Sequence, residues 1–205
     1  YQSRRFNSLL LITISILSMP QKSILPNPIW KDAITVCREL QTGNVSAEEL
    51  MQNVYDRINF INPEVNAIVN LLPQKEALDL ARQADKIPIT ERGPLHGLPM
   101  AMKDSVAVKG FPTTVGFRPF AERIETQDSP LAERMRKAGV IFIGHTNMPE
   151  FGLGSNTFNS VFGATHNPYD LSKTAGGSSG GAAAALATDM LPLADGSDMG
   201  GSLRN

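Results

Sequence analysis

Two stretches near the end of the chain decide its fold: Thr174-Ala-Gly-Gly-Ser-Ser-Gly-Gly181 and Ala194-Asp-Gly-Ser-Asp-Met-Gly-Gly-Ser-Leu-Arg204. Each places serines among glycines, and the segment between them predicts a short helix (Ala182 to Asp189) and a short apolar strand (Met190 to Ala194). Glycine permits a positive φ and lets other groups approach the main chain closely. Consecutive backbone N–H groups in such turns can bind a developing negative charge, so the pattern predicts an oxyanion-binding site.

A third stretch lies upstream and reads Gly93-Pro-Leu-His-Gly-Leu-Pro-Met-Ala-Met-Lys-Asp104. Its apolar residues, Leu98 to Met102, predict a strand that leads directly into Lys103, a residue type that is rarely buried without a purpose. A helix opened by Ser129-Pro130 and an apolar strand from Val140 to Ile143 follow. Strand, helix and strand in this order predict a βαβ unit with a buried parallel pair.

Together the three motifs resemble those of the amidase signature family, and they occur in the order expected for it. The resemblance implies an α/β fold with a mixed β-sheet core covered by helices. It runs from about Ile34 to the last residue and matches about the first half of a typical member, so we expect this fold to be incomplete, with the C-terminal half missing. Residues 19–205 are then the N-terminal part of a single amidase domain, and residues 1–18 an extension or signal-like segment.

The resemblance also implies a catalytic triad. Ser202 corresponds to the nucleophile that forms an acyl-enzyme, and Lys103 to the base. Ser178 corresponds to the bridging serine, whose peptide bond with Gly177 is cis in the family. The lysine must be neutral to accept a proton, and burial lowers a lysine pKa by up to ~3–5 units. Its position at the end of an apolar strand agrees with that requirement.

The remaining site residues belong to the two serine clusters. The family's oxyanion hole and substrate contacts correspond to the backbone of Met199, Gly200 and Gly201. Three neighbours have supporting roles: Ser179 through hydrogen bonds, and Asp198 with Arg204 by holding the turn of the nucleophile together. No cofactor is implied. The three histidines, His96, His145 and His166, lack the spacing and the neighbours of a metal site, so we expect no metal.

The function that this implies is hydrolysis of a carboxylic amide to an acid and ammonia or an amine, with a small-molecule amide as substrate. One alternative within the family is the ammonia-generating component of the tRNA-dependent glutamine amidotransferase, its A-type chain, which supplies ammonia to a partner enzyme. Its second cluster usually reads Gly-Thr-Asp-Thr-Gly-Gly-Ser, whereas Gly196-Ser-Asp-Met-Gly-Gly-Ser is more similar to stand-alone amidases. A further alternative is an inactive fragment, which would be poorly soluble and without turnover because the cut at Asn205 exposes sheet edges.

Two other interpretations of the first cluster stay open. Gly176-Gly-Ser-Ser-Gly180 matches the nucleophile elbow of α/β-hydrolases, but that triad needs a histidine after the serine, and all three histidines precede Ser178. A glycine-rich loop that opens a helix can also bind phosphate, but the chain lacks the G-x-x-x-x-G-K-[ST] pattern. His145 stands where many amidase relatives have lysine.

The composition indicates which kinds of partner and which cellular compartment to expect. The 19 basic and 20 acidic residues nearly cancel and form no basic stripe, so a nucleic acid is not an expected partner; a homodimer is compatible with the sequence. The lone Cys37 fits a reducing, cytoplasmic compartment. Arg4-Arg5 precede an apolar run, Leu9 to Leu17, that is too short to span a membrane. If this segment acts as a signal peptide, the protein is exported. The alternative is that Met19 is the true start and the residues before it are an extension of the reading frame.

Elsewhere the sequence predicts scaffold helices and one long loop. Helical spacing covers Ile29 to Leu40 and Glu76 to Lys86. Between these two, Ser46-Ala-Glu-Glu49 forms a capping box for a helix that stops before Pro63. Residues 150–170 are rich in glycine and asparagine, which predicts a loop without regular elements.

Overall fold

The structure, a computed structural model, describes residues 32–204. Its α-helices in that range are α2 (Ala33–Thr42), α3 (Ala47–Val65), α4 (Gln74–Asp85), α5 (Pro130–Lys137) and α6 (Gly180–Ala187). Its strands are β1 (Ile68–Val69), β2 (Pro99–Lys103), β3 (Ile141–Thr146), β4 (Phe158–Asn159), β5 (Gly163–Ala164), β6 (His166–Asn167) and β7 (Asp170–Thr174). Short 3-10 helices lie at Ile89–Glu91, Arg118–Phe120 and Glu150–Gly152. The predictions for residues 1–18, Met19 and residues 29–31 lie outside the described range.

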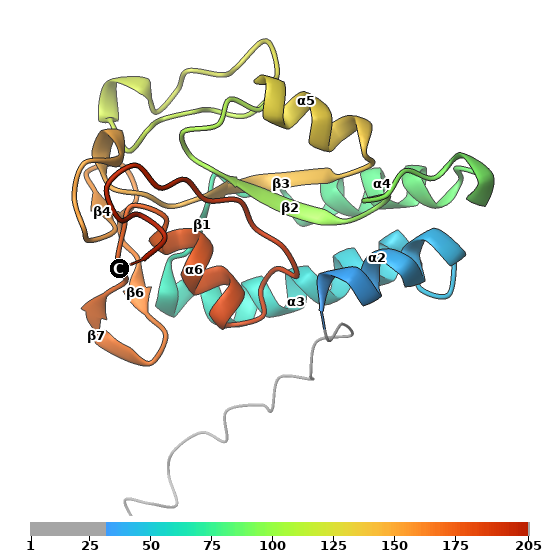
Figure 1. Ribbon diagram of the computed structural model, residues 1–205, viewed down its shortest axis with the longest axis horizontal. Coiled ribbons are helices and arrows are strands. Elements are labelled where there is room, and N and C mark those ends of the chain that lie inside the picture. Colours follow the sequence, from blue (N-terminus) through green and yellow to red (C-terminus); the bar gives the residue numbers. More distant parts are fainter. Residues whose placement is uncertain (1–31, 205) are drawn as a thin grey trace, which may run out of the picture.

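The central sheet has the order β1-β3-β2. Strands β2 and β3 are parallel and α5 connects them, which confirms the predicted βαβ unit; β1 runs antiparallel to β3, so the sheet is mixed. In this register Lys103, the last residue of β2, lies opposite Thr146 at the end of β3. The carboxyl ends of both parallel strands therefore lie at the same side of the sheet (Figure 1), and Lys103 is at the carboxyl end of β2.

Helices cover both faces of this sheet, as the sequence predicts (Figure 1). On one face Met100, Met102 and Phe142 pack with Ala132 of α5 in a small apolar cluster. On the other face the larger core gathers side chains of the strands with those of α2, α3, α4 and α6. The two clusters take alternate residues of β2, which is the period-two pattern of a strand buried on both sides.

Helix α3 illustrates how the sequence sets a boundary. The Ser46 hydroxyl accepts a hydrogen bond from the Glu49 amide at 3.0 Å, so the predicted N-cap is confirmed. The expected stop before Pro63 is wrong, because the helix continues to Val65 and ends at a left-handed Asn66 with φ 54°. The side-chain oxygen of Asn62 accepts from the amides of the two residues after that turn, Ala67 and Ile68, and so fixes the path of the chain as it leaves the helix for β1.

Two further predictions are wrong. Residues 150–170 are not a loop without regular elements, since two small antiparallel hairpins, β4–β5 and β6–β7, form from this segment onward. Residues Met190 to Ala194 form no strand. Pro192 has no N–H to donate to a ladder, and the free amide at the end of β2 bonds instead to a side chain, the carboxylate of Asp195.

Helix α6 begins two residues before the predicted Ala182 and ends two before Asp189. Within residues 32–204, no helix combines the length and the apolar character that crossing a bilayer requires.

Candidate active site

Lys103 is the centre of the site. It is only 1% exposed although it carries an amine, because it ends β2, a strand whose five residues are all buried. Its Nζ donates hydrogen bonds to three hydroxyls, which belong to Ser178 at 2.8 Å, Ser179 at 2.9 Å and Ser197 at 3.0 Å. These bonds satisfy all three N–H donors that a lysine ammonium can offer.

A second hydrogen bond continues outward from this centre. The Ser178 hydroxyl donates to the Ser202 hydroxyl at 2.8 Å, and the peptide bond between Gly177 and Ser178 is cis. The structure thus brings together Lys103, Ser178 and Ser202, the three side chains singled out in the sequence, in one continuous chain of hydrogen bonds. Lys103 and Ser202, the candidate nucleophile, do not bond to each other directly, because the Ser178 hydroxyl lies between them.

Close packing fixes the first serine cluster. Ser178 and Ser179 are both buried and immediately precede α6. A Cβ on Gly180 would lie 2.1 Å from the Thr157 hydroxyl, and one on Gly181 would lie 2.3 Å from the Asn147 backbone nitrogen. Only glycine lets the start of α6 approach the neighbouring main chain this closely. The Thr157 side chain and the Asn147 main chain therefore pack directly against the start of α6, next to the two serines.

The second serine cluster is a turn held by one carboxylate. Asp198 accepts from the Gly201 amide at 2.7 Å, from the Leu203 amide at 3.3 Å and from the Arg204 guanidinium at 2.8 and 3.0 Å. The hydrogen bonds from Arg204 and then from Gly201 hold the pKa of Asp198 far below its ordinary value. These contacts join Asp198 and Arg204 to the turn, and their supporting role in a reaction stays a prediction. Met199 beside it is 97% exposed.

The backbone amides of this turn are not equivalent. Within residues 32–204, the amides of Met199 and Gly200 make no hydrogen bond, whereas the Gly201 amide is occupied by Asp198. A Cβ on Gly200 would meet no atom within 4 Å. Of the three predicted oxyanion-binding residues, Met199 and Gly200 are therefore exposed with their amides available, whereas Gly201 is buried and its amide is occupied.

Burial and two acidic side chains set the electrostatics of Lys103. Burial lowers the pKa of its amine, and the carboxylates of Asp195 and Asp198 oppose that shift. Asp195 accepts a hydrogen bond from the Lys103 backbone amide at 2.8 Å, and burial raises the pKa of its own carboxyl. Asp195 and Ser197 were not singled out in the sequence, although both lie inside the second motif.

Comparison with known proteins shows the family. The family model described as Amidase matches residues 49–205. The chain belongs to the amidase family. It is 42% identical over 176 residues to an acylamidase of Rhodococcus erythropolis, covering 85% of this chain and 37% of the relative. It is 43% identical to the A-type chain of the glutamyl-tRNA(Gln) amidotransferase of Acidothermus cellulolyticus, covering 86% of this chain and 35% of that protein.

Solved amidases share its fold. A bacterial aryl acylamidase of the amidase signature family superposes with a TM-score of 0.77 at 34% identity, over 85% of this chain and 37% of that one. A 6-aminohexanoate cyclic dimer hydrolase gives a TM-score of 0.76 at 32% identity, over 87% and 36%. The chain thus spans little more than a third of the length of these amidases.

Two buried ionisable side chains, Asp104 and His145, lie next to the lysine in the central sheet and the loop after β2. Asp104 accepts from the amide and the hydroxyl of Thr114 and from the Gly116 amide, so it anchors the loop that follows β2. His145 on β3 is fully buried; its Nε2 lies 3.2 Å from the Val106 carbonyl oxygen, and its Nδ1 has no hydrogen-bond partner within residues 32–204. Burial lowers the pKa of this imidazole, and Asp104 opposes the shift.

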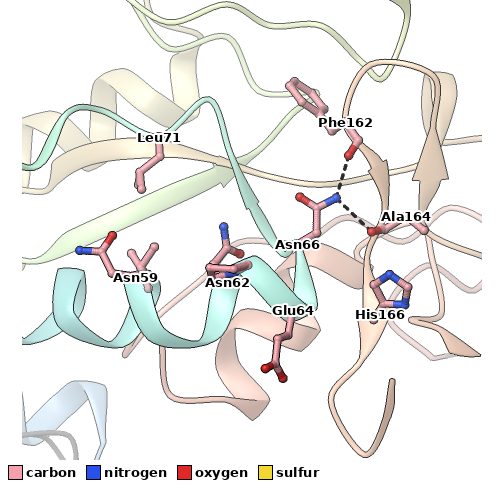
Figure 2. Close-up of a pocket in the computed structure, with 10 residues that line it drawn as sticks. Asn59, Asn62, Glu64, Asn66, Leu71, Phe162, Ala164 and His166 are labelled. Atoms are coloured by element: carbon pink, nitrogen blue, oxygen red, sulfur yellow. Dashed lines mark hydrogen bonds between the residues drawn. The ribbon is translucent and has the colours of Figure 1, made fainter. Parts of the chain in front are cut away.

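Two cavities lie near this part of the molecule, and only one of them borders the serine clusters. A cavity of about 220 Å³ adjoins the serine clusters and includes Ser179, Asp195 and Ser202 in its wall. A larger one of about 580 Å³ lies between α3 and the hairpins, where Asn66 donates to the carbonyls of Phe162 and Ala164 (Figure 2). The larger cavity shares no lining residue with the serine clusters. Among the described residues, no group of three or more His, Cys, Asp and Glu side chains could hold a metal ion.

Proposed function

We propose that the protein is an amidase that hydrolyses a carboxylic amide to an acid and ammonia or an amine, through an acyl-enzyme on Ser202. The observation that carries this proposal is the unbroken series of 2.8 Å hydrogen bonds from Lys103 Nζ through the Ser178 hydroxyl to the Ser202 hydroxyl. A nucleophile, a mediator and a base within hydrogen-bond reach are what acyl transfer needs. The family membership and the acylamidase relative support the same reaction class.

The direction of these hydrogen bonds suggests how the amine starts the reaction. In the structure Lys103 donates to Ser178, which donates to Ser202, the arrangement expected of a protonated amine. Once the amine has lost a proton, its lone pair can accept from Ser178, and Ser178 can then accept from Ser202. Burial lowers the lysine pKa and so favours this neutral form.

Acylation then follows with balanced protons. The Ser202 oxygen attacks the amide carbon, its proton passes to Ser178, and the Ser178 proton passes to Lys103. Collapse of the tetrahedral intermediate breaks the C–N bond, and the same relay in reverse delivers one proton to the leaving nitrogen. Water attacks the acyl-enzyme in the second half, giving its proton to the relay and regenerating the Ser202 hydroxyl as the acid leaves.

The turn around Ser202 supplies the oxyanion donors in this proposal. The amides of Met199 and Gly200 are available, and the Gly201 amide becomes available when it exchanges the Asp198 carboxylate for the substrate oxygen. Each such donor contributes about 2.7–4 kcal/mol to lowering the barrier. Ser179 supports the site by accepting from Lys103, and Arg204 by its ion pair with Asp198.

A serine-directed fluorophosphonate probe tests the proposal with the purified protein. Peptide mass spectrometry should locate the label on Ser202, and Ser202→Ala should remove both the label and the hydrolysis of a panel of aliphatic, aromatic and amino-acid amides. Thermal unfolding provides the control that Ser202→Ala is folded. Labelling of Ser178 in place of Ser202 would contradict the proposal and favour a nucleophile elbow.

The relatives favour one second candidate, the A-type chain of a glutamine amidotransferase. Several of the similar proteins carry that name, at up to 46% identity for the one from Salinispora arenicola. In that case glutamine would be the preferred amide, and ammonia release would rise when the partner proteins of the amidotransferase are added. A glutaminase rate that exceeds the rate on all other amides of the panel would favour this candidate over a stand-alone amidase.

A further inference from the structure

Asp195 occupies a position that the reaction scheme above leaves without a role. Strand β2 is an edge of the central sheet, and the backbone amide of its last residue, Lys103, faces away from β3. A neighbouring strand would normally supply a carbonyl oxygen there. The segment after α6 forms no strand, and the Asp195 Oδ1 accepts this amide at 2.8 Å instead. A carboxylate thus replaces a backbone group at the lysine of the site.

The placement of Asp195 links it to both ends of the same lysine. Two residues later, the Ser197 hydroxyl accepts from Lys103 Nζ at 3.0 Å, while the Ser179 hydroxyl bonds to the backbone of Ser197. Asp195 therefore fixes the main chain of Lys103, and the chain that follows it fixes the amine. Its carboxyl is partly buried and also lines the cavity beside Ser179 and Ser202.

The negative charge of Asp195 also affects how well the Lys103 amine can act as a general base. Burial alone makes a lysine amine easy to deprotonate but a weak base, whereas a general base works best with a pKa near the working pH. A negative charge close to the amine favours the ammonium form and counters burial. The other ionisable groups that face this region are Asp198 in the same segment, His145 on β3 and Asp104 after β2.

We propose that Asp195 is a positioning residue for Lys103: it anchors the end of β2 through the backbone amide, and its negative charge keeps the buried amine basic enough to act on Ser178. This inference rests on the proposed function for its catalytic meaning. The link between the carboxylate and the lysine amine, however, is a property of the folded protein and can be measured without turnover.

The test is a pH titration of Lys103 followed by its Cε chemical shift in protein labelled with ¹³C-lysine. Asp195→Asn keeps an oxygen that can accept the Lys103 amide but removes the charge. We expect the midpoint of the Lys103 titration to fall by about one pH unit in this variant. Asp195→Glu restores the charge and should bring the midpoint most of the way back. Asp56→Asn removes an equal charge from the exposed surface of α3 and should leave the midpoint unchanged.

An unchanged Lys103 midpoint in folded Asp195→Asn overturns the proposal. If that variant does not fold, the test uses the unmodified protein. The chemical shift of the Asp195 carboxyl carbon should then change twice with pH, once at its own midpoint and once at the midpoint of Lys103. A single step that is independent of Lys103 overturns the proposal. Where amide hydrolysis is measurable, the acid limb of kcat/KM should move to lower pH by the same amount as the midpoint. If the titrations give the expected result but the protein hydrolyses no amide, the proposed function is wrong and the link between Asp195 and Lys103 still holds.

Discussion

The two serine clusters have similar sequences and opposite environments. The first, Gly176 to Gly181, packs closely against the Thr157 side chain and the Asn147 main chain, and its glycines leave no room for a methyl group at Gly180 or Gly181. The second, Gly196 to Arg204, is mostly exposed and depends on the carboxylate of Asp198 for its shape. The comparison teaches that a glycine-serine pattern can mean a tightly packed site or an open turn. In this chain the first cluster fixes Ser178 and Ser179, and the second presents Ser202, the proposed nucleophile.

Lys103→Met should have the largest effect, because the amine serves both clusters. Methionine has a similar length, so the core stays filled, but the relay loses its base. We expect amide hydrolysis to fall by at least about a thousandfold while circular dichroism is unchanged. Hydrolysis within tenfold of the unsubstituted protein would show that the first cluster does not carry the relay.

The same variant gives a pH signature in the free energy of unfolding. The folded-state pKa of Lys103 lies below its ordinary value near 10.4, so between the two the unfolded state binds more protons. Stability from this group is therefore lowest below the folded pKa and rises with pH toward 10.4. Urea unfolding across this range should show the rise in the unsubstituted protein and a smaller rise in Lys103→Met.

Glycine substitutions should separate the clusters by stability. In Gly181→Ala the new methyl group meets the backbone of Asn147 and Ala67, and we expect a loss of about 3 kcal/mol in the free energy of unfolding. Gly200→Ala places its methyl group in open space and should change stability by less than about 0.5 kcal/mol. Urea unfolding of both variants checks this, and equal losses would contradict the contrast between the clusters.

Asp198→Asn should loosen only the second cluster. Its carboxylate has a depressed folded-state pKa, so the stability it contributes is present above the ordinary Asp value near 3.9 and is lost as the pH falls below it. At neutral pH we expect the Gly201 amide to exchange with solvent about tenfold faster in Asp198→Asn. Amides of α6 should keep their protection. Asp170→Asn, which removes a turn-capping carboxylate from the β6–β7 hairpin, is the matched control.

The smallest effect is expected at Met199. Its side chain is almost fully exposed, so Met199→Ala should leave the free energy of unfolding within about 0.5 kcal/mol of the original value. A larger loss in urea unfolding would mean that the second cluster is packed more tightly than its exposure indicates.

Much of the fold follows from local patterns in the sequence. The capped start of α3, the helix opened by Ser129-Pro130 and the βαβ unit all follow from spacing and capping residues. The meeting of Lys103 with Ser178 and Ser202 follows from the three family-like motifs rather than from any one residue type. Each of these features can be predicted because its sequence signal lies within a few residues or in the order of the three motifs.

The remaining features depend on partners far away in the chain. The bonds of Lys103 to Asp195 and Ser197 span 92 and 94 positions, and neither residue differs locally from an ordinary turn residue. The apolar run from Met190 predicts a strand by composition, but pairing requires donors that Pro192 lacks. In the two hairpins after residue 155, β4, β5 and β6 have two residues each, too short to give a periodic signal, and β7 has five residues that are mostly exposed and polar.

The bond from the Gly201 amide to Asp198 has a kinetic consequence for inhibitors. An anionic mimic of the tetrahedral intermediate that uses this amide must first displace a carboxylate belonging to the protein itself. Such a compound would associate slowly and dissociate slowly, so progress curves should bend over time and not reach a steady velocity at once. Compounds that engage only Met199 and Gly200 would act without that lag.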